Sequence, residues 1–265
     1  MEIKTYEIQT AKLKKDEKPL RLAMLSDLHD RLWGQGQQKL LEAIDSLSPD
    51  LVLCAGDMLV GGEQAAMNHA LLLFQELSKR QPPVIACNGN HESRMRQQTR
   101  IYKDQYAYYA GKLKDYGVKV LVNESCMIKV RSANVRIYGY EMSLAYYHKL
   151  HTPPYDGEDL YRQFGVPDMD AYDILLAHNP VYFKAYAAWG ADLTLSGHLH
   201  GGIIRIPGIG GLITPQVRLF PRYDRGLFEV NGKYLAVSPG LGEHTVPIRI
   251  FNPPQLFCII VKGTG

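Results

Sequence analysis

Residues 20–57 read LRLAMLSDLHDRLWGQGQQKLLEAIDSLSPDLVLCAGD, and this stretch decides the predicted fold. Two apolar runs of strand length, 20–25 and 51–55, enclose a segment in which apolar residues recur at helical spacing, 37–47. Residues 48–50, Ser-Pro-Asp, break that helix before the second strand begins. The stretch therefore predicts a strand–helix–strand unit of the kind that builds a parallel sheet.

The same alternation of strand-like and helical patterns continues to about residue 195 and then stops. Strands are expected at 84–87, 118–122, 127–130, 135–140, 173–177 and 193–195, and helices at 63–79, 97–115 and 180–190. Strand-like runs without helices follow at 203–206, 226–230, 233–238 and 256–262. Strands that alternate with helices indicate a largely parallel sheet covered by helices, and the β-rich end predicts a second sheet packed on the first.

The chain is expected to form one domain, residues 1–265, because it shows no linker, internal repeat or low-complexity tract. The stretch 142–170 is long, aromatic and interrupted by proline and glycine. Long loops in compact domains are often functional, so this stretch is the candidate for an insertion or lid.

Composition and charge limit the classes of function. The chain has 265 residues, 46% hydrophobic and 22% charged, as is typical of a globular protein with a sizeable core. The formal net charge of +3 gives no strong indication of nucleic-acid binding. No segment has the length and apolarity of a signal peptide or a membrane span. Four cysteines without a Cys-x-x-Cys pair favour buried thiols, so a cytoplasmic location is expected, with peripheral membrane contact left open.

Polar residues that can bind metal ions follow the expected strands directly. The candidate ligands are Asp27, His29, Asp57, Asn90, His178, His198 and His200. Loops at the carboxyl ends of parallel strands meet at one edge of a sheet, so these residues can converge although they lie far apart in the sequence. Residues two apart in extended chain point the same way, which lets Asp27 and His29 reach one centre. His198 and His200 either share this geometry or reach adjacent ions across a turn.

The chemistry of these donors favours a pair of divalent ions. Imidazole, carboxylate and amide without thiolate suit manganese, iron or zinc, and differ from a structural zinc site. Seven ligands exceed the needs of one ion, whereas two ions that share a bridging carboxylate would use them all. Two ions about 3.5–4 Å apart can clamp the attacking and leaving oxygens of a phosphoryl displacement.

The order of these motifs resembles a known superfamily. Asp-x-His, Gly-Asp, Gly-Asn-His-Glu, His and Gly-His-x-His occur in the order typical of calcineurin-like metallophosphoesterases, over residues 22–202. The runs GHLHGGIIRIPGIGGLITP and VSPGLGEHTVPIRIFNPPQ resemble the bacterial membrane-associated branch, which includes phosphodiesterases and relatives of UDP-diacylglucosamine pyrophosphatase. Many members of that branch have an N-terminal membrane segment, which is not expected from residues 1–265, and a Gln where this chain has Ile203. The resemblance implies a four-layer αββα sandwich of two mixed β-sheets flanked by helices.

The resemblance also implies a role for each site residue. The first ion would be held by Asp27, His29, Asp57 and His200. The second ion would be held by Asp57, Asn90, His178 and His198, so that Asp57 bridges the pair. His91 would assist the leaving group as a proton donor or a positive charge, and Glu92 would either orient His91 or be solvated.

The predicted activity is hydrolysis of phosphodiester or pyrophosphate bonds by in-line attack of metal-bound hydroxide. Two divalent ions, Mn, Fe or Zn, are the expected cofactors, with Mn the expected choice in vitro. A phosphorylated small molecule or a lipid-linked compound is the expected substrate. A non-catalytic metal-dependent scaffold and a nuclease with the same metal chemistry are the alternatives. The tyrosines at 102–109 fit either a packing face or base stacking, and Arg249 either a phosphate contact or an outer strand face.

Overall fold

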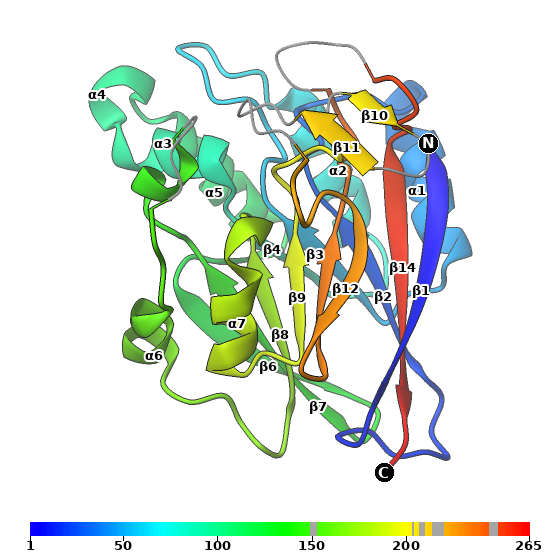
Figure 1. Ribbon diagram of the computed structural model, residues 1–265. Helices are drawn as coiled ribbons and strands as arrows, with labels where there is room; N and C mark the ends of the chain where they lie inside the picture. Colours follow the sequence, from blue (N-terminus) through cyan, green and yellow to red (C-terminus); the bar gives the residue numbers. More distant parts are fainter. Residues whose placement is uncertain (149–152, 203, 207–209, 214–219, 244–248) are drawn as a thin grey trace.

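The computed structural model describes residues 1–148, 153–202, 204–206, 210–213, 220–243 and 249–265. Two six-stranded sheets lie face to face at its centre, as Figure 1 shows. The first sheet has the order β1 (Glu2–Thr10), β14 (Gln255–Gly263), β2 (Leu20–Leu25), β3 (Leu51–Ala55), β4 (Val84–Cys87) and β5 (Lys119–Leu121). The second has the order β12 (Gly226–Val230), β13 (Lys233–Val237), β9 (Leu193–Ser196), β8 (Tyr172–Ala177), β7 (Ala133–Tyr140) and β6 (Glu124–Val130).

Helices cover the outer face of each sheet (Figure 1). The first sheet carries α1 (Gln38–Ser46), α2 (Asn68–Ser78) and α5 (Gln105–Asp115). The second carries α6 (Glu158–Phe164) and α7 (Phe183–Trp189). The shorter elements are α3 (Asn90–Gln97), α4 (Thr99–Tyr102), the 3-10 helices η1 (Gln35–Gln37), η2 (Leu144–Tyr147) and η3 (Pro180–Tyr182), and the antiparallel pair of β10 (Ile204–Ile206) and β11 (Gly210–Ile213). The layers are therefore helix, sheet, sheet and helix, which confirms the predicted four-layer sandwich of two mixed sheets.

The alternation of side chains along each central strand explains why these runs are apolar throughout. In β3, Val52 and Cys54 pack beneath the helices, whereas Leu51 and Leu53 pack between the two sheets. A strand that is buried on both faces cannot alternate apolar with polar residues, because both sets of side chains lose contact with water. The central strands thus hold the two sheets and both helical layers together.

The division of strands between the sheets differs from the prediction. The second sheet is not built from the β-rich end alone, because β6 to β9 belong to it. The last strand, β14, returns to the first sheet and runs antiparallel to β2. β1 pairs in parallel with β14 at the edge of that sheet, and the sequence did not predict it because most of its residues are exposed and form no apolar run.

The predicted helix at 97–115 is also wrong as a single element. The chain forms α3, α4 and α5 instead, and it leaves helical geometry at Gln98 (φ −106°, ψ 55°) and Lys103 (φ 50°, ψ −130°). Tyr109 on α5 is buried and packs edge-on against Phe74, with ring centroids 6.4 Å apart. Tyr109 therefore belongs to a packing face, one of the two interpretations considered for the tyrosines at 102–109. Tyr108, in contrast, is 56% exposed and does not belong to that face.

Candidate metal centre

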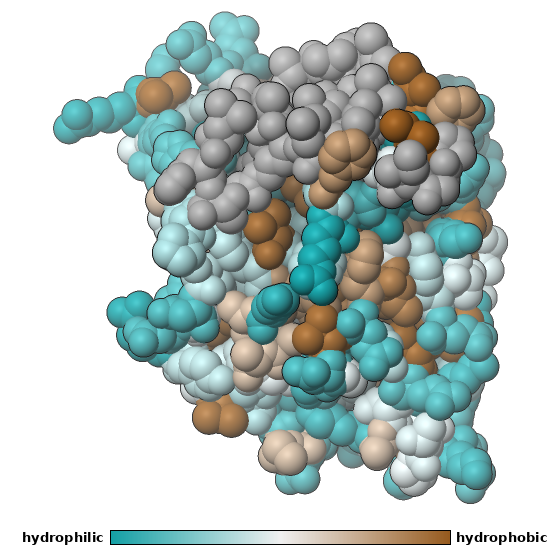
Figure 2. Space-filling model, viewed as in Figure 1, coloured by the Kyte–Doolittle hydropathy of each residue, from teal (hydrophilic) through white to brown (hydrophobic). Residues whose placement is uncertain are grey.

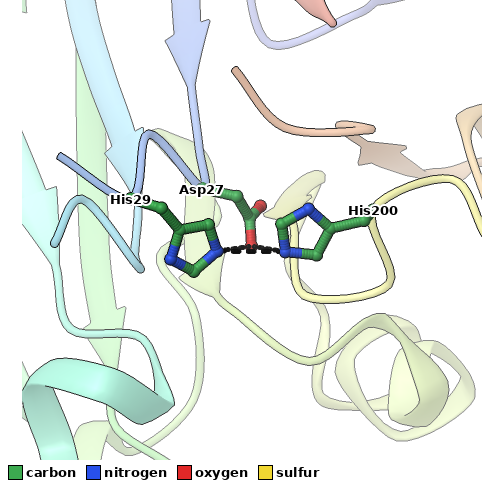
Figure 3. A group of neighbouring side chains, drawn as sticks. All are labelled: Asp27, His29 and His200. Carbon is green, nitrogen blue, oxygen red and sulfur yellow. Dashed lines mark hydrogen bonds and ion pairs between the residues drawn. The ribbon is translucent and has the colours of Figure 1, made fainter. Parts of the chain in front are cut away.

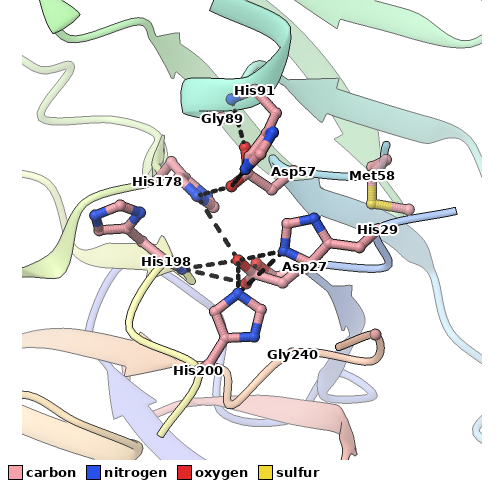
Figure 4. A network of polar contacts seen from close by, with 12 residues as sticks. Asp27, His29, Asp57, Met58, Gly89, His91, His178, His198, His200 and Gly240 are labelled. Atoms are coloured by element: carbon pink, nitrogen blue, oxygen red, sulfur yellow. Dashed lines mark hydrogen bonds and ion pairs between the residues drawn. The ribbon is translucent and has the colours of Figure 1, made fainter. Parts of the chain in front are cut away.

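The candidate ligands converge at the edge where strands of both sheets end (Figure 4). Asp27 follows β2 and Asp57 follows β3, both in the first sheet, whereas His178 follows β8 and His198 follows β9 in the second. The prediction placed these loops along the rim of one parallel sheet. The site instead lies between the two sheets, so each sheet supplies one wall of ligands.

The first group of ligands is Asp27, His29 and His200 (Figure 3). Oδ1 of Asp27 lies 3.3 Å from Nε2 of His200 and 3.9 Å from Nε2 of His29. The two Nε2 atoms are 3.0 Å apart, and all three residues are buried. Two bonds of about 2.0–2.1 Å from one ion to two imidazoles, meeting near a right angle, give about this separation. The geometry therefore fits a shared cation.

The second group is Asp57, His178 and His198 (Figure 4). It lies on the other side of the carboxylates of Asp27 and Asp57 from the first group. Nε2 of His178 lies 3.1 Å from Oδ2 of Asp57 and 3.7 Å from Oδ1 of Asp27. The backbone N–H of His198 donates to both carboxylate oxygens of Asp27, at 3.1 and 3.2 Å. The two groups are thus in contact through their carboxylates, as two neighbouring ions would require.

The backbone brings these ligands together in a way that the sequence argument did not anticipate. Asp27, His29, His198 and His200 have φ angles of 48°, 47°, 71° and 51°, which lie in the left-handed region. The extended geometry assumed for Asp27 and His29 is therefore wrong, although both side chains reach the same group. His198 and His200 belong to different groups, as expected for a turn. Left-handed backbone in residues other than glycine is costly and is often found at functional sites.

Asn90 is the first residue of α3, directly after β4, and it is 5% exposed. Its Oδ1 is buried and accepts no hydrogen bond from any residue in the described part of the chain. A buried amide oxygen without a donor is costly, because it has lost its contact with water. A cation at this position would satisfy it, which fits the predicted role of Asn90 as a ligand.

Hydrogen bonds to the far side of two imidazole rings distinguish His178 from His91. Nδ1 of His178 lies 2.6 Å from the carbonyl oxygen of Ala55, so Nδ1 keeps a proton, and Nε2 is the nitrogen that would bind a metal ion once it is deprotonated. Nδ1 of His91 accepts a hydrogen bond of 3.0 Å from the N–H of Gly61, so the proton of the neutral ring is on Nε2. Nε2 of His91 lies 4.0 Å from Oδ2 of Asp57 and therefore faces the site as a donor.

Burial excludes one of the two roles considered for Glu92 from the sequence. It is 1% exposed, so its carboxylate is not solvated. Its oxygens accept backbone N–H groups of Asp57 (3.0 Å), Met58 (2.8 Å) and Gly89 (3.0 Å). Burial, together with the charge of Asp57, raises the pKa of Glu92 to about 7. Glu92 therefore fixes the loop that carries Asp57 against the start of α3.

The electrostatics of the site favour positive charge. Burial lowers the pKa of His178, but the carboxylates of Asp57 and Asp27 outweigh it and raise this pKa to about 10. Burial raises the pKa of Asp27 to about 6, whereas the pKa of Asp57 lies well below its usual value because nearby imidazoles, His178 first, outweigh its burial. Two buried carboxylates thus attract cations, and bound divalent ions would replace the proton on His178.

A loop after β13 supports the centre, and the sequence singled out Arg249 in it but not Gly240. Gly240 has φ 80°, and a Cβ there would lie 2.8 Å from Cβ of Asp27. Arg249 donates to the carbonyl oxygen of Pro239 at 2.8 Å, and its Nη2 lies 3.5 Å from Nδ1 of His200. Arg249 therefore lies at the edge of the site rather than on an outer strand face. The dipeptide Pro239-Gly240 was the available signal, but its position beside Asp27 depends on β13 joining β9.

Tyr147 in η2 was also missed. Its ring lies edge-on to His198, with centroids 4.9 Å apart, and tilted against His178 at 6.3 Å. The segment 142–170 thus reaches the second group of ligands through an aromatic contact. It also contains η2 and α6, two helical elements that its proline and glycine content did not predict.

Hydrophobic and hydrophilic residues are interleaved over the face of the molecule in Figure 2. Among the helices of the described residues, none combines the length and the apolar character needed to cross a membrane.

Comparison with known proteins agrees with this geometry. The family model of calcineurin-like phosphoesterases matches residues 20–202. A metallophosphoesterase of Aquifex aeolicus, named as uncharacterized, is 29% identical, with 100% of this chain and 93% of the relative aligned. Phosphodiesterase YaeI of Escherichia coli is 27% identical, with 74% of this chain and 64% of that protein aligned.

A solved structure shows the same fold at low identity. The putative 5'-nucleotidase from Staphylococcus aureus superposes with a TM-score of 0.53 at 11% identity, covering 94% of this chain and 55% of that chain. At such low identity, the similarity shows only that the fold is shared. The family match, by contrast, covers every predicted metal ligand. The chain therefore belongs to the calcineurin-like phosphoesterases and is a metal-dependent phosphoric ester hydrolase.

Proposed function

We propose that this protein hydrolyses phosphodiester or pyrophosphate bonds with two divalent ions bound side by side. One observation carries the proposal: two groups of buried ligands, one from each side of Asp27 and Asp57, are in contact through these carboxylates. A single ion would not need the ligands of both groups. The name of the E. coli relative, a phosphodiesterase, supports the preference for diesters.

The proposed ligands follow the two groups. The first ion takes Asp27, His29, Asp57 and His200, and the second takes Asp57, Asn90, His178 and His198. Asp57 is the proposed bridge because its carboxylate lies 3.1 Å from His178 of the second group and is also close enough to His29 of the first group to share an ion with it. When bound, the two ions supply an activated water and offset charge on the phosphoryl oxygens.

The chain itself supplies a hydrogen-bond donor for the leaving group and the orientation of the site. Nε2–H of His91 faces the centre and donates to the oxygen of the departing group, which stabilises the charge that develops there. The hydrogen bond from Gly61 favours a neutral ring, so His91 acts as a hydrogen-bond donor rather than as a positive charge. Glu92 accepts the backbone N–H groups of Asp57 and Gly89 and so holds the two residues together, and the carbonyl oxygen of Ala55 orients His178.

Several finer features remain proposals. Imidazole and carboxylate donors suit Mn, Fe or Zn, and Mn is the proposed ion in vitro. We treat residues 1–265 as one domain in which 142–170 forms a wall or lid through Tyr147. Phosphorylated small molecules are the proposed substrates. A lipid-linked substrate, peripheral membrane contact, the pyrophosphatase-related branch and a cytoplasmic location stay predictions.

A pair of chromogenic esters tests the proposed function. The purified protein, loaded with Mn²⁺, is assayed with bis-p-nitrophenyl phosphate and with p-nitrophenyl phosphate, which share one leaving group. The proposal expects faster turnover of the diester, abolished by chelation and restored by Mn²⁺. Preferential hydrolysis of the monoester would contradict the substrate class. Absence of turnover with either ester, despite two bound ions, would contradict the activity.

A further inference from the structure

We propose that a cavity beside the metal centre binds a flat aromatic group carried by one alcohol of the phosphodiester, an inference that rests on the proposed function. The cavity has a volume of about 560 Å³. Its wall contains three tyrosines, Tyr155, Tyr182 and Tyr223, together with three prolines. A volume of this size holds a ring system with its attached sugar or linker.

The cavity and the ligands share the same short segments of chain. Leu199 lines the cavity and stands between His198 and His200. Tyr182 lies in η3, which follows His178 in the same loop after β8. We infer from this shared chain that one ester substituent of a phosphate held at the ions reaches the cavity.

Neighbouring rings hold the three tyrosines of the wall in place. Tyr182 meets Tyr155 and Tyr146 nearly edge-on, with centroids 5.2 and 5.3 Å apart. The hydroxyl of Tyr155 donates to Asp159 at 2.6 Å, and Tyr223 packs edge-on against Phe183 at 5.6 Å. Rigid walls lose little conformational entropy when a ligand binds, so this cavity is organised before the ligand arrives.

Charge at the cavity matches an anionic ligand. Lys184 and Arg222 line it and are exposed, and the guanidinium of Arg222 stands 5.3 Å from the centre of the Tyr223 ring. The lining residues that the structure describes include no carboxylate. The cavity therefore attracts a ligand that carries the negative charge of a phosphodiester.

The shape of the wall favours a flat ring over a flexible chain. Tyrosine and proline present rigid planar or nearly planar surfaces, and aromatic pairs gain attraction beyond the area that they bury. A flexible acyl chain would gain only the hydrophobic term and would lose its own rotational freedom on binding. Planarity is therefore the property by which the cavity selects its ligand.

Three phosphinates test this selection without any hydrolysis. Diphenylphosphinate, dicyclohexylphosphinate and dimethylphosphinate carry the same PO₂⁻ group, contain no ester bond and differ in their substituents. Isothermal titration calorimetry on the Mn²⁺-loaded protein should show diphenylphosphinate binding roughly tenfold more tightly than dimethylphosphinate. It should also bind more tightly than dicyclohexylphosphinate, although the cyclohexyl groups are the more hydrophobic. Equal or tighter binding of the dicyclohexyl compound would overturn the flat-ring assignment.

A pair of variants on α7 locates the effect. Ala185→Leu fills the cavity and should abolish the advantage of the phenyl groups while leaving dimethylphosphinate binding unchanged. Ala188→Leu makes the same change at an exposed position of the same helix and should leave all three affinities unchanged. An undiminished phenyl advantage in a folded Ala185→Leu protein would overturn the proposal, as would failure of the wild-type protein to bind diphenylphosphinate.

Turnover separates this proposal from the proposed function. Ring-selective binding by a protein that hydrolyses no diester would contradict the function and leave the cavity assignment standing. Hydrolysis of diesters by a protein that binds all three phosphinates equally would contradict the cavity assignment and leave the proposed function standing.

Discussion

At the scale of single residues, the hydrogen bonds behind the imidazole rings distinguish the side chain proposed to bind metal from the side chain proposed to donate a hydrogen bond. Sequence motifs place His91 and His178 at the same edge but cannot distinguish their tautomers. The difference comes from Ala55, which accepts from one ring, and Gly61, which donates to the other. These backbone partners lie 123 and 30 positions away in the sequence, so the pairing becomes visible only after folding.

His91→Ala should keep both metal ions and lose turnover, by roughly 10²–10³-fold on substrates with poor leaving groups, because a neutral Nε2–H hydrogen-bond donor is removed. Substrates with good leaving groups should lose less. A series of aryl phosphodiesters of graded leaving-group pKa measures the difference. Equal losses across the series would argue against a hydrogen bond from His91 to the leaving group.

Asp57→Ala should lose both ions together, because the proposed bridge contributes to both sites. Metal analysis of the dialysed protein by inductively coupled plasma mass spectrometry gives the stoichiometry. A variant that still holds two full equivalents of metal would refute the bridging role.

Glu92→Gln should lower the free energy of unfolding by about 1.5–3 kcal/mol, because a buried carboxylate that accepts several N–H groups is replaced by an amide that also presents donors to them. Glu76→Gln is the control, since its ion pair with Lys79 on the surface of α2 is worth less than about 1 kcal/mol. Urea unfolding of the metal-free proteins compares the two. Similar effects from both substitutions would contradict the role assigned to Glu92.

At the scale of elements, the central strands and the helices packed on them could be predicted because burial on one or two faces imposes a pattern on the sequence. β2, β3, β4, β8 and β9 all occur where apolar runs predicted strands. β1 could not be predicted in this way, because it is an exposed edge strand whose partner, β14, lies at the other end of the chain. The left-handed turns at Asp27 and His198 were likewise hidden, since neither residue is glycine.

Close approach of β3 and α3 gives a prediction at this scale. A Cβ on Gly89 would lie 2.2 Å from Oδ1 of Asp57 and 2.5 Å from its backbone nitrogen. Gly89→Ala should therefore displace Asp57, weaken metal binding and destabilise the fold by about 1–3 kcal/mol.

Gly111→Ala is the matched control, since none of the described residues places an atom within 4 Å of a Cβ there. Within α5 this change should add about 0.5–1 kcal/mol of stability. Thermal melts and metal titration measure both variants, and normal metal affinity in Gly89→Ala would count against the proposed contact.

At the scale of the whole molecule, two sheets supply opposite walls of one centre, so the site exists only when the sandwich is closed. The sequence identified the superfamily, and the family match agrees with that assignment. The prediction from the sequence assigned the strands to the two sheets incorrectly, because an apolar run does not specify which sheet a strand will join.

Metal binding should release protons and strengthen as the pH rises. In the metal-free protein the pKa of His178 is raised to about 10 by Asp57 and Asp27, so the ring is protonated at pH 7 and must lose that proton to bind an ion. The gain in affinity continues until the pH passes this pKa. Calorimetric titration of Mn²⁺ in buffers of different ionisation enthalpy counts the protons. An observed enthalpy that does not vary with the buffer would contradict this coupling.

Anomalous scattering from crystals grown with Mn²⁺ tests the central claim most directly. The account predicts two peaks about 3.5–4 Å apart, one within bonding distance of Asp27, His29 and His200 and the other of Asn90, His178 and His198, with Asp57 between them. A single peak, or two peaks that do not share Asp57, would contradict it.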